Sequence, residues 1–288
     1  MALDNTRFLN QVKLKASLPT GRFTDQEILD IAYDVLLTDA QPFLISLRSE
    51  YYTKKTSTTI VSGTATYPIN TRALGLSLRE VKFTDSAGQV SNLIQLSPED
   101  INESTSGKPY AFYLEGVNLI LFPTPDQSAT LVQTYFQRVN RPVEATACAL
   151  VTAIDTITGV VTADIPSGWT TSNTYDFISR NNGNDTLVKD LTPTAVGTTD
   201  ITFTASDIPA SLAVGDYITL AGETPYIQVP DEVVSLVVLL TCADLMESMG
   251  DAQSSGMAFQ KADRLKVGLS RSLMPRVQGE GVKFRPTI

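Results

Sequence analysis

The chain offers few side chains that carry out catalysis, and the most informative residue type is one that it lacks. None of its 288 residues is histidine, which excludes a Ser-His-Asp triad, a Cys-His dyad and a histidine metal site. Its two cysteines, Cys148 and Cys242, form no Cys-x-x-Cys motif and show no metal-ligand spacing. No Walker-type phosphate loop is present either. We therefore expect no catalytic residue, no metal and no cofactor.

Three weaker signals for chemistry have structural alternatives. The 31 acidic side chains supply candidates for glycosidase chemistry, but no spacing singles out a pair. Residues 181–185 superficially resemble a calcium loop, yet Thr192 stands where an EF-hand needs Glu, so a hairpin tip is the better interpretation. Trp169, the only tryptophan, fits a sugar platform or, as we favour, an aromatic anchor in a small β-domain.

A basic stripe near the C-terminus is the strongest candidate for a binding surface. On the helix expected between Asp251 and Pro275, an apolar stripe lies beside a stripe of Lys261, Arg264, Gly268 and Arg271. Residues 254–288 carry seven bases and two acids, a net charge of +5. The stripe fits a solvated helix face, a nucleic-acid contact or, as we favour, a dock for an acidic protein surface. A basic and aromatic tail that follows it is typical of segments ordered by another chain.

The overall charge argues against a protein that grips nucleic acid. The net charge is −9 and the sequence pI is about 4.6, whereas nucleic-acid binding depends on neutralising phosphates with Lys and Arg. Residues 146–226 contain nine acids and two bases, a net charge of −7. This one segment therefore carries a net charge of −7, compared with −9 for the whole chain.

Length and hydropathy place the chain among globular proteins. Its length favours one large domain or two ordinary ones, and 42% apolar residues suffice for a core. The start shows no basic region followed by an apolar run, so we expect no signal peptide. The apolar run at residues 233–240 is much shorter than the ~18–20 residues of a membrane span. We expect a soluble protein made in a cytoplasm.

The periodicities predict helices at both ends of the chain and strands between them. The first 20 residues look like an arm or loop, and Thr24 with Glu27 forms a capping box that begins a helix. A second, shorter helix is expected over residues 42–52. Period-two patterns then predict strands at 78–83 and 89–95, a hairpin over 110–122 and a strand over 129–139.

The remainder predicts a small β module followed by two helices. Short strands between turns in residues 146–226 indicate a β-barrel or sandwich. An apolar helix follows Pro230, and Gly250 ends it. The fold class is therefore α+β, a helical bundle from the N- and C-terminal helices with a β-hairpin region and an inserted β module. We assign residues 1–145 to helices and β-hairpins, 146–226 to the acidic insertion, and 227–288 to C-terminal helices and tail.

One run of sequence resembles a known family. Residues 67–81, Tyr-Pro-Ile-Asn-Thr-Arg-Ala-Leu-Gly-Leu-Ser-Leu-Arg-Glu-Val, are similar to the Tyr-Pro-Ile-Pro-x-Arg-Ala-x-Gly-x-x-Leu-Arg-Glu-Val run of head-to-tail adaptor proteins from tailed phages. The similarity continues through residues 222–232 and 250–276, and Asn70 replaces the second proline, which affects only a turn.

The resemblance implies a structural part of a short-tailed phage particle. Such adaptors form a ring, which we expect to hold twelve copies, beneath the portal, where the ring extends the DNA channel and carries the tail or nozzle. The implied partners are other copies of the chain, the portal protein, and tail, nozzle or tail-fibre proteins, with DNA only passing through. The implied location is the head–tail interface of the virion, after assembly in the host cytoplasm. By position, the implied portal-binding residues are Lys261, Arg264, Arg271, Arg276, Lys283, Phe284 and Arg285.

Three other functions remain open at this point. A tail completion or stopper protein that never meets the portal would share the structural character of an adaptor. A β-rich carbohydrate-binding module would use Trp169 and the acidic loops. An enzyme is the weakest alternative, because no catalytic set of residues is visible.

Overall fold

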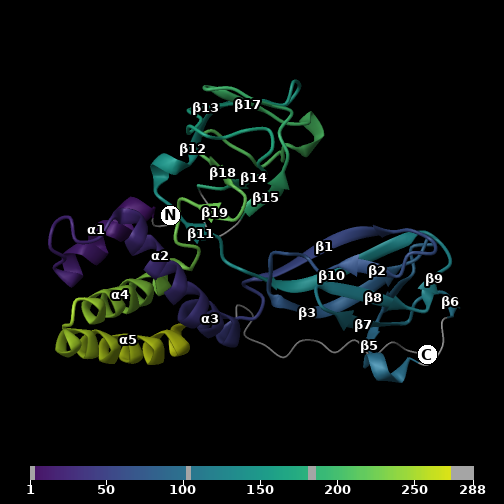
Figure 1. Cartoon of the computed structure of the whole chain (residues 1–288), viewed down its shortest axis with the longest axis horizontal. Coiled ribbons are helices and arrows are strands. Elements are labelled where there is room, and N and C mark those ends of the chain that lie inside the picture. The colour runs from purple at the N-terminus through teal and green to yellow at the C-terminus, as the bar shows by residue number, and fades with distance from the viewer. Residues whose placement is uncertain (1–3, 102–104, 181–185, 274–288) are drawn as a thin grey trace. The chain divides into compact units, whose positions relative to one another are not determined.

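The chain is a mixed α+β protein, as the sequence predicts, and it divides into two compact units (Figure 1). The computed structural model describes residues 4–101, 105–180 and 186–273. Residues 1–48 and 139–288 belong to unit 1, and residues 49–138 form unit 2. Unit 1 holds all the α-helices of the described residues and the acidic β segment. Unit 2 is built from strands and one short 3-10 turn.

Unit 1 contains the helices at both ends of the chain. Their bounds are α1 Asn5–Ala16, α2 Asp25–Val35, a π-helix Leu36–Ala40, α3 Gln41–Leu47, α4 Asp231–Ser248 and α5 Ala252–Ser272.

The expectation of a loop over the first 20 residues is wrong, because residues 5–16 form α1. Asp4 caps this helix by accepting a hydrogen bond from the amide of Arg7. The buried side chains of Phe8, Leu9 and Val12 follow helical spacing, so one face packs into the core. This spacing was visible in the sequence but is diluted by polar residues on the opposite face.

Helix α2 begins as predicted, and the joint after it takes an unexpected form. Thr24 and Glu27 make both hydrogen bonds of the capping box. The helix then continues without interruption through the π-helix into α3, whose second residue is Pro42. The second helix therefore ends at Leu47, earlier than the sequence predicts.

Helix α4 lies at the centre of the helices. It packs against α1, α2 and α5, and it is apolar on nearly every side, as the sequence predicts (Figure 1). None of the helices in the described residues is long and apolar enough to cross a bilayer. Asp251 caps α5 by accepting from the amide of Ser254 at 3.0 Å.

The acidic segment forms one seven-stranded sheet, in the order β15-β14-β18-β12-β13-β17-β16. The sequence predicts a β-barrel or sandwich here, and a closed barrel is not formed, because β15 and β16 are the two ends of this order and do not pair. A cluster around the rings of Tyr175, Phe177 and Phe203 forms the core. The strands are β12 Ala149–Asp155, β13 Val160–Ala163, β14 Tyr175–Ile178, β15 Thr186–Leu191, β16 Ala195–Val196, β17 Asp200–Thr202 and β18 Tyr217–Leu220.

Unit 2 contains two four-stranded sheets that share one hydrophobic core. Their orders are β1-β10-β3-β4 and β2-β8-β7-β5. Side chains from both, including Phe83 and Tyr135 of the first and Tyr67 and Leu119 of the second, belong to the same buried cluster. The strands are β1 Thr53–Ile60, β2 Thr66–Pro68, β3 Ala73–Thr84, β4 Val90–Asn92, β5 Ile94–Gln95, β6 Ser106–Gly107, β7 Ala111–Glu115, β8 Asn118–Phe122, β9 Thr124–Pro125 and β10 Ala129–Gln137.

A short parallel pair of strands joins the acidic sheet to the helices within unit 1. Strand β11, Arg141–Pro142, pairs with β19, Glu223–Thr224. The Arg141 guanidinium donates to both carboxylate oxygens of Asp30 on α2, at 2.9 and 3.0 Å. The amide of the Asn5 side chain donates to the carbonyls of Val143 and Thr224, at 2.6 and 3.1 Å. Helices α1 and α2 therefore both hold this strand pair.

A buried carboxylate fixes the other side of the strand pair. Asp176, at the start of β14 and 0% exposed, accepts hydrogen bonds from the Asn140 side chain and from the amides of Gly222 and Asp190. The backbone amide of Asn140 in turn donates to Oε1 of the Gln228 side chain at 2.7 Å. A buried carboxylate is tolerated when donors satisfy its oxygens, and these donors come from three separate segments of the chain.

Replacing Asp176 tests this junction. We expect Asp176→Ala to lower the free energy of unfolding by about 2–3 kcal/mol, because the buried donors lose their acceptor. Asp164→Ala, at an exposed position of the same segment, is the matched control and should change stability by less than about 0.5 kcal/mol. Urea titrations followed by circular dichroism measure both. Equal stability of the two variants would contradict a structural role for the Asp176 contacts.

Candidate functional site

The structure brings three of the predicted binding residues together on one exposed side of α5. Lys261, Arg264 and Arg271 are all exposed, and the spacings of three and seven residues place them on adjacent turns of one side. The predicted apolar stripe faces the other way: Ala258, Ala262, Leu269 and Leu273 are buried and Leu265 is half-buried. The predicted helix and its separate apolar and basic stripes are therefore confirmed.

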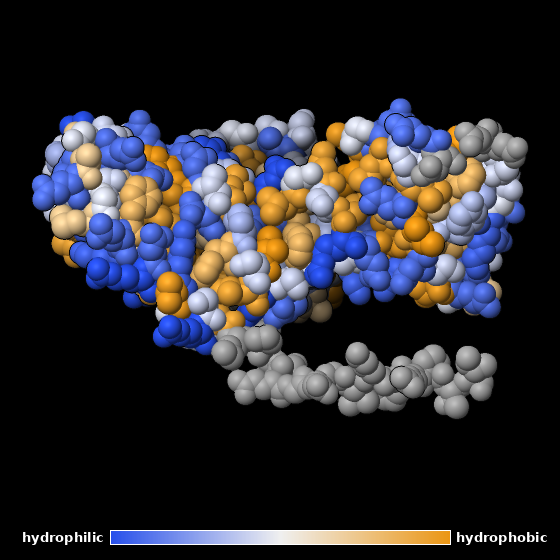
Figure 2. Space-filling view, turned by 90° about the horizontal axis from the view of Figure 1, so that it is seen from below, coloured by the Kyte–Doolittle hydropathy of each residue, from blue (hydrophilic) through white to orange (hydrophobic). Residues whose placement is uncertain are grey.

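The remaining predicted residues cannot be placed. Arg276, Lys283, Phe284 and Arg285 lie outside the described residues, as does the loop 181–185 that superficially resembles a calcium site. The surface that the structure defines is thus the exposed side of α5, and we call Lys261, Arg264 and Arg271 the α5 basic face. Figure 2 views the molecule from the side on which α5 lies, and hydrophilic residues predominate over the helices there.

Gly268 lies within the α5 basic face and leaves it open. A Cβ atom added at this glycine would meet no atom within 4 Å, so the glycine is not required by packing inside the chain. Glycine in a helix interior costs roughly 0.5–1 kcal/mol relative to alanine. Val267, the residue before Gly268, is 55% exposed and adds an apolar side chain next to the α5 basic face.

A fourth basic residue of α5 has a partner within the chain, which the sequence analysis missed. The Lys266 ammonium lies 2.8 Å from a carboxylate oxygen of Asp39, in the π-helix. The spacing of two residues from Arg264 turns Lys266 away from the basic face, and this offset is the signal that could have separated it. The ion pair fastens α5 to the segment between α2 and α3.

Asp39 belongs to a group of acidic side chains that influence one another. Burial, and next the charges of Asp39, Glu247 and Asp34, raise the pKa of Asp244 on α4 above its usual value. The ionised form of Asp244 is thus disfavoured in the folded protein. Lys266 supplies the one positive charge paired with this group among the described residues.

The thiols show why the cysteines are unsuited to chemistry. Both are free and buried, and burial raises the pKa of the Cys242 thiol to about 11 and that of Cys148 above its usual range. Because the thiolate is the nucleophile and the metal ligand, neither is activated near neutral pH. In the part of the chain that the structure describes, no three Cys, Asp or Glu side chains are grouped to hold a metal ion.

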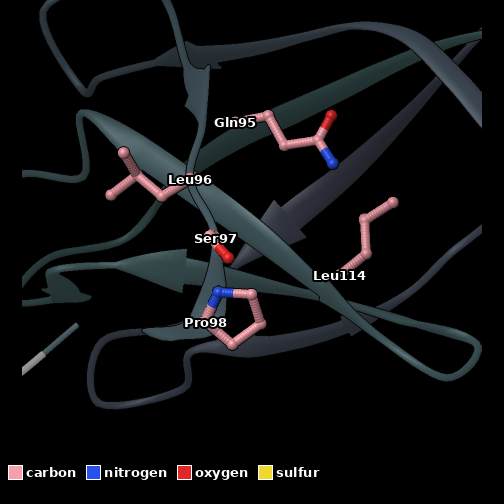
Figure 3. Close-up of a pocket in the computed structure, with 5 residues that line it drawn as sticks. All are labelled: Gln95, Leu96, Ser97, Pro98 and Leu114. Atoms are coloured by element: carbon pink, nitrogen blue, oxygen red, sulfur yellow. The ribbon is translucent and has the colours of Figure 1, made fainter. Parts of the chain in front are cut away.

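Trp169 lies against the core of the β module, and a surface pocket in unit 2 is lined by side chains that do not titrate. The half-buried Trp169 ring packs on Tyr175, with 4.8 Å between ring centroids, against the core of the β module. The core interpretation is thus confirmed. An open pocket of about 410 Å³ in unit 2 is lined by Gln95, Leu96, Ser97, Pro98 and Leu114 (Figure 3). None of these five side chains titrates, so the pocket supplies no acid–base group.

Comparison with known proteins gives the class of the chain. A sequence profile of the SU10 adaptor protein family matches residues 7–171, more than half of the chain. The chain belongs to this family of phage head-to-tail adaptors and is a virion component. A search of curated proteins gives no match.

The raised pKa of Asp244 leads us to expect that replacing this residue stabilises the protein in a pH-dependent way. The raised pKa of Asp244 means that its ionisation opposes folding once the pH exceeds the usual carboxyl range. Asp244→Asn should therefore raise the melting temperature at pH 7, because the substitution removes the charge whose formation burial and the neighbouring carboxylates oppose. Below about pH 4, where the unfolded carboxyl is protonated, the gain should vanish.

Asp263→Asn, at an exposed position on α5, is the matched control for this measurement. Differential scanning fluorimetry from pH 3.5 to 8 compares the two variants with the parent chain. A gain for Asp244→Asn that is the same at every pH would contradict the electrostatic explanation.

Proposed function

We propose that the chain is the adaptor that forms a ring under the portal of a short-tailed phage. The ring, of twelve copies in this proposal, extends the DNA channel and gives the tail or nozzle its platform. Family membership over residues 7–171 supports the adaptor class. The observation that carries the portal contact is the α5 basic face, whose three cations are exposed and directed away from the core.

The portal contact rests on charge and exposure. The bulk of the chain is acidic, yet the α5 basic face is followed by a tail that adds Arg276, Lys283 and Arg285, with Phe284 as an aromatic anchor. Electrostatic complementarity steers such a surface toward an acidic partner and fixes its orientation. We propose that these residues and the basic face together bind the portal, and that residues 146–226 act as a distinct inserted module between 1–145 and 227–288.

The net charge of −9 also suits passage of DNA. A wall that neutralised phosphates would bind the DNA and slow its movement, whereas an acidic wall does not. The proposal therefore makes DNA a passenger in the channel and not a ligand. In this scheme the protein acts by geometry and assembly, with no reaction of its own.

Charge reversal on α5 tests the portal contact. A chain with Lys261→Glu, Arg264→Glu and Arg271→Glu should fold normally but lose at least tenfold in affinity for the portal encoded with it. The matched control is Arg7→Glu, Lys15→Glu and Arg22→Glu, the same charge change at exposed positions near α1. Co-sedimentation with purified portal rings measures both. Equal binding by the two variants would exclude the α5 basic face as the contact.

Removal of the tail tests the second part of the contact. Deletion of residues 276–288 should leave a folded chain, because these residues follow the last element of the described structure. We expect the truncated chain not to join portal rings in electron micrographs. Normal joining would overturn the role of the tail, and normal joining by both the truncated chain and the α5 variant would favour a tail completion protein.

A further inference from the structure

Strand β1 presents a long, regular and exposed edge. It lies at one end of the sheet β1-β10-β3-β4 and pairs with β10 through eight residues without a register shift. Among the described strands it is the longest at a sheet edge. Natural edges are usually blunted by bulges, proline or shortness, and an edge without them is a template for another strand. Here only Lys54 and Lys55 at one end provide a charged guard.

The hydrogen-bond alternation identifies which backbone groups of β1 point to this edge. The amide of Gln137 donates to the Tyr52 carbonyl at 2.7 Å, so this pair is one of the hydrogen-bonded pairs of the β1–β10 ladder. In an antiparallel ladder such pairs alternate with pairs whose backbone groups point outward. Along β1 the outward groups therefore belong to Lys55, Ser57 and Thr59, and the side chains of all three are exposed.

The opposite edge of the same sheet is β4, and its alternation is equally well defined. The amide of Leu93 donates to the Val81 carbonyl at 2.9 Å, which marks a hydrogen-bonded pair of the β3–β4 ladder. The outward backbone groups of β4 therefore belong to Val90 and Asn92. Both side chains are exposed as well.

The two edges match in level, direction and face. Followed through the pairs across β10 and β3, Thr59 is level with Val90, and Ser57 is level with Asn92. Successive strands of the sheet are antiparallel, so β1 and β4 run in opposite directions. A neighbouring copy in the same orientation, as in a ring, thus offers β4 antiparallel to β1. Directly paired residues share a face, so all four side chains lie on one face.

Two exposed valines flank these edges. Val90 in β4 is 62% exposed, and Val61, the residue after β1, is 57% exposed. With Thr59 opposite Val90, Val61 lies one pleat further along on the same face, at the diagonal position where side chains still touch. The pairing would thus remove both valines from water.

We propose that adjacent copies of the chain associate by pairing β1 of one copy with β4 of the next. Thr59 then exchanges two backbone hydrogen bonds with Val90, and Ser57 exchanges two with Asn92, in one continuous antiparallel sheet. The contact joins two different edges, so it is heterologous and generates a ring where the rotation closes. This inference rests on the proposed function, because a ring of copies is its premise.

The short length of β4 determines when the contact forms. A pairing of three residues is too small to hold two free copies together at ordinary concentration. Copies held side by side on a portal have a high effective concentration for each other, and the same pairing then closes. The chain therefore remains largely monomeric alone and forms the continuous sheet on the portal.

Disulfide trapping tests the pairing in the full chain. Hydrogen-bonded antiparallel partners have Cα atoms about 5.5 Å apart, within the range for a disulfide. A Thr59→Cys, Val90→Cys chain, oxidised with copper phenanthroline on portal rings, should give a ladder of linked copies. The matched control, Thr66→Cys with Val90→Cys, places the first cysteine on β2, an edge of the other sheet, and should give severalfold less product. The native thiols are buried and serve in both variants as a constant background.

The outcomes separate the pairing from the portal contact. If the chain co-sediments with portal rings but the Thr59→Cys, Val90→Cys variant gives no more linked product than the control, the pairing is wrong. The adaptor function is then unaffected. If the chain does not bind the portal, the adaptor function fails, and the same trapping at high chain concentration without portal decides the pairing: an excess over control supports it, and none overturns it.

A backbone variant gives a second, independent measure. Val90→Pro removes an outward amide donor and no bond of the β3–β4 ladder, so the chain should keep its thermal unfolding transition. Chains with Ser57→Cys and Asn92→Cys, the other directly opposed pair, should form a ladder of linked copies on portal rings. We expect that ladder to be lost when Val90→Pro is added and kept with Val90→Thr. Equal linking in both would overturn the pairing, and if Val90→Pro does not fold, the trapping experiment alone decides.

Discussion

The buried carboxylate of Asp176 is the contact on which the arrangement of unit 1 depends. Its oxygens accept donors from three separate segments, including Asn140 and Gly222, next to the strand pair β11–β19. The same strand pair is held from the helical side by Asn5 and Arg141. A carboxylate taken out of water needs its donors in place, so Asp176 fixes the acidic sheet against the segments that lead into β11 and β19. Asn5 and Arg141 then fix that strand pair against the helices.

This constraint explains how a chain can insert a β module between helices without losing one compact unit. Helix α4 follows the module and packs against α1 and α2, which precede it. The strand pair β11–β19 brings the two ends of the insertion together. The apolar surface of α4 then closes the core, and α5 covers α4 while its other side, with the basic face, stays exposed. The exposed basic face is thus a consequence of the packing order.

The two candidate surfaces belong to different units and have different chemistry. The basic face of α5 is charged and acts at a distance, which suits recognition of a partner. Edge strand β4 of unit 2 carries no charge, and β1 carries only Lys54 and Lys55 at one end. Both strands offer backbone groups, which suit a contact that forms once copies are already adjacent. A division of this kind lets recognition precede ring closure.

The sequence by itself determined the elements with strong local signals. Thr24 and Glu27 specify the start of α2, Asp251 that of α5, and the apolar and basic stripes of α5 follow from helical spacing. It missed α1, whose polar face conceals the apolar one, and it predicted a barrel or sandwich where the structure has one open sheet. Only the tertiary structure decided the Asp176 junction, the Lys266–Asp39 pair and the match of β1 with β4. These depend on residues far apart in sequence, and local propensity carries no information about which distant donors and edges meet.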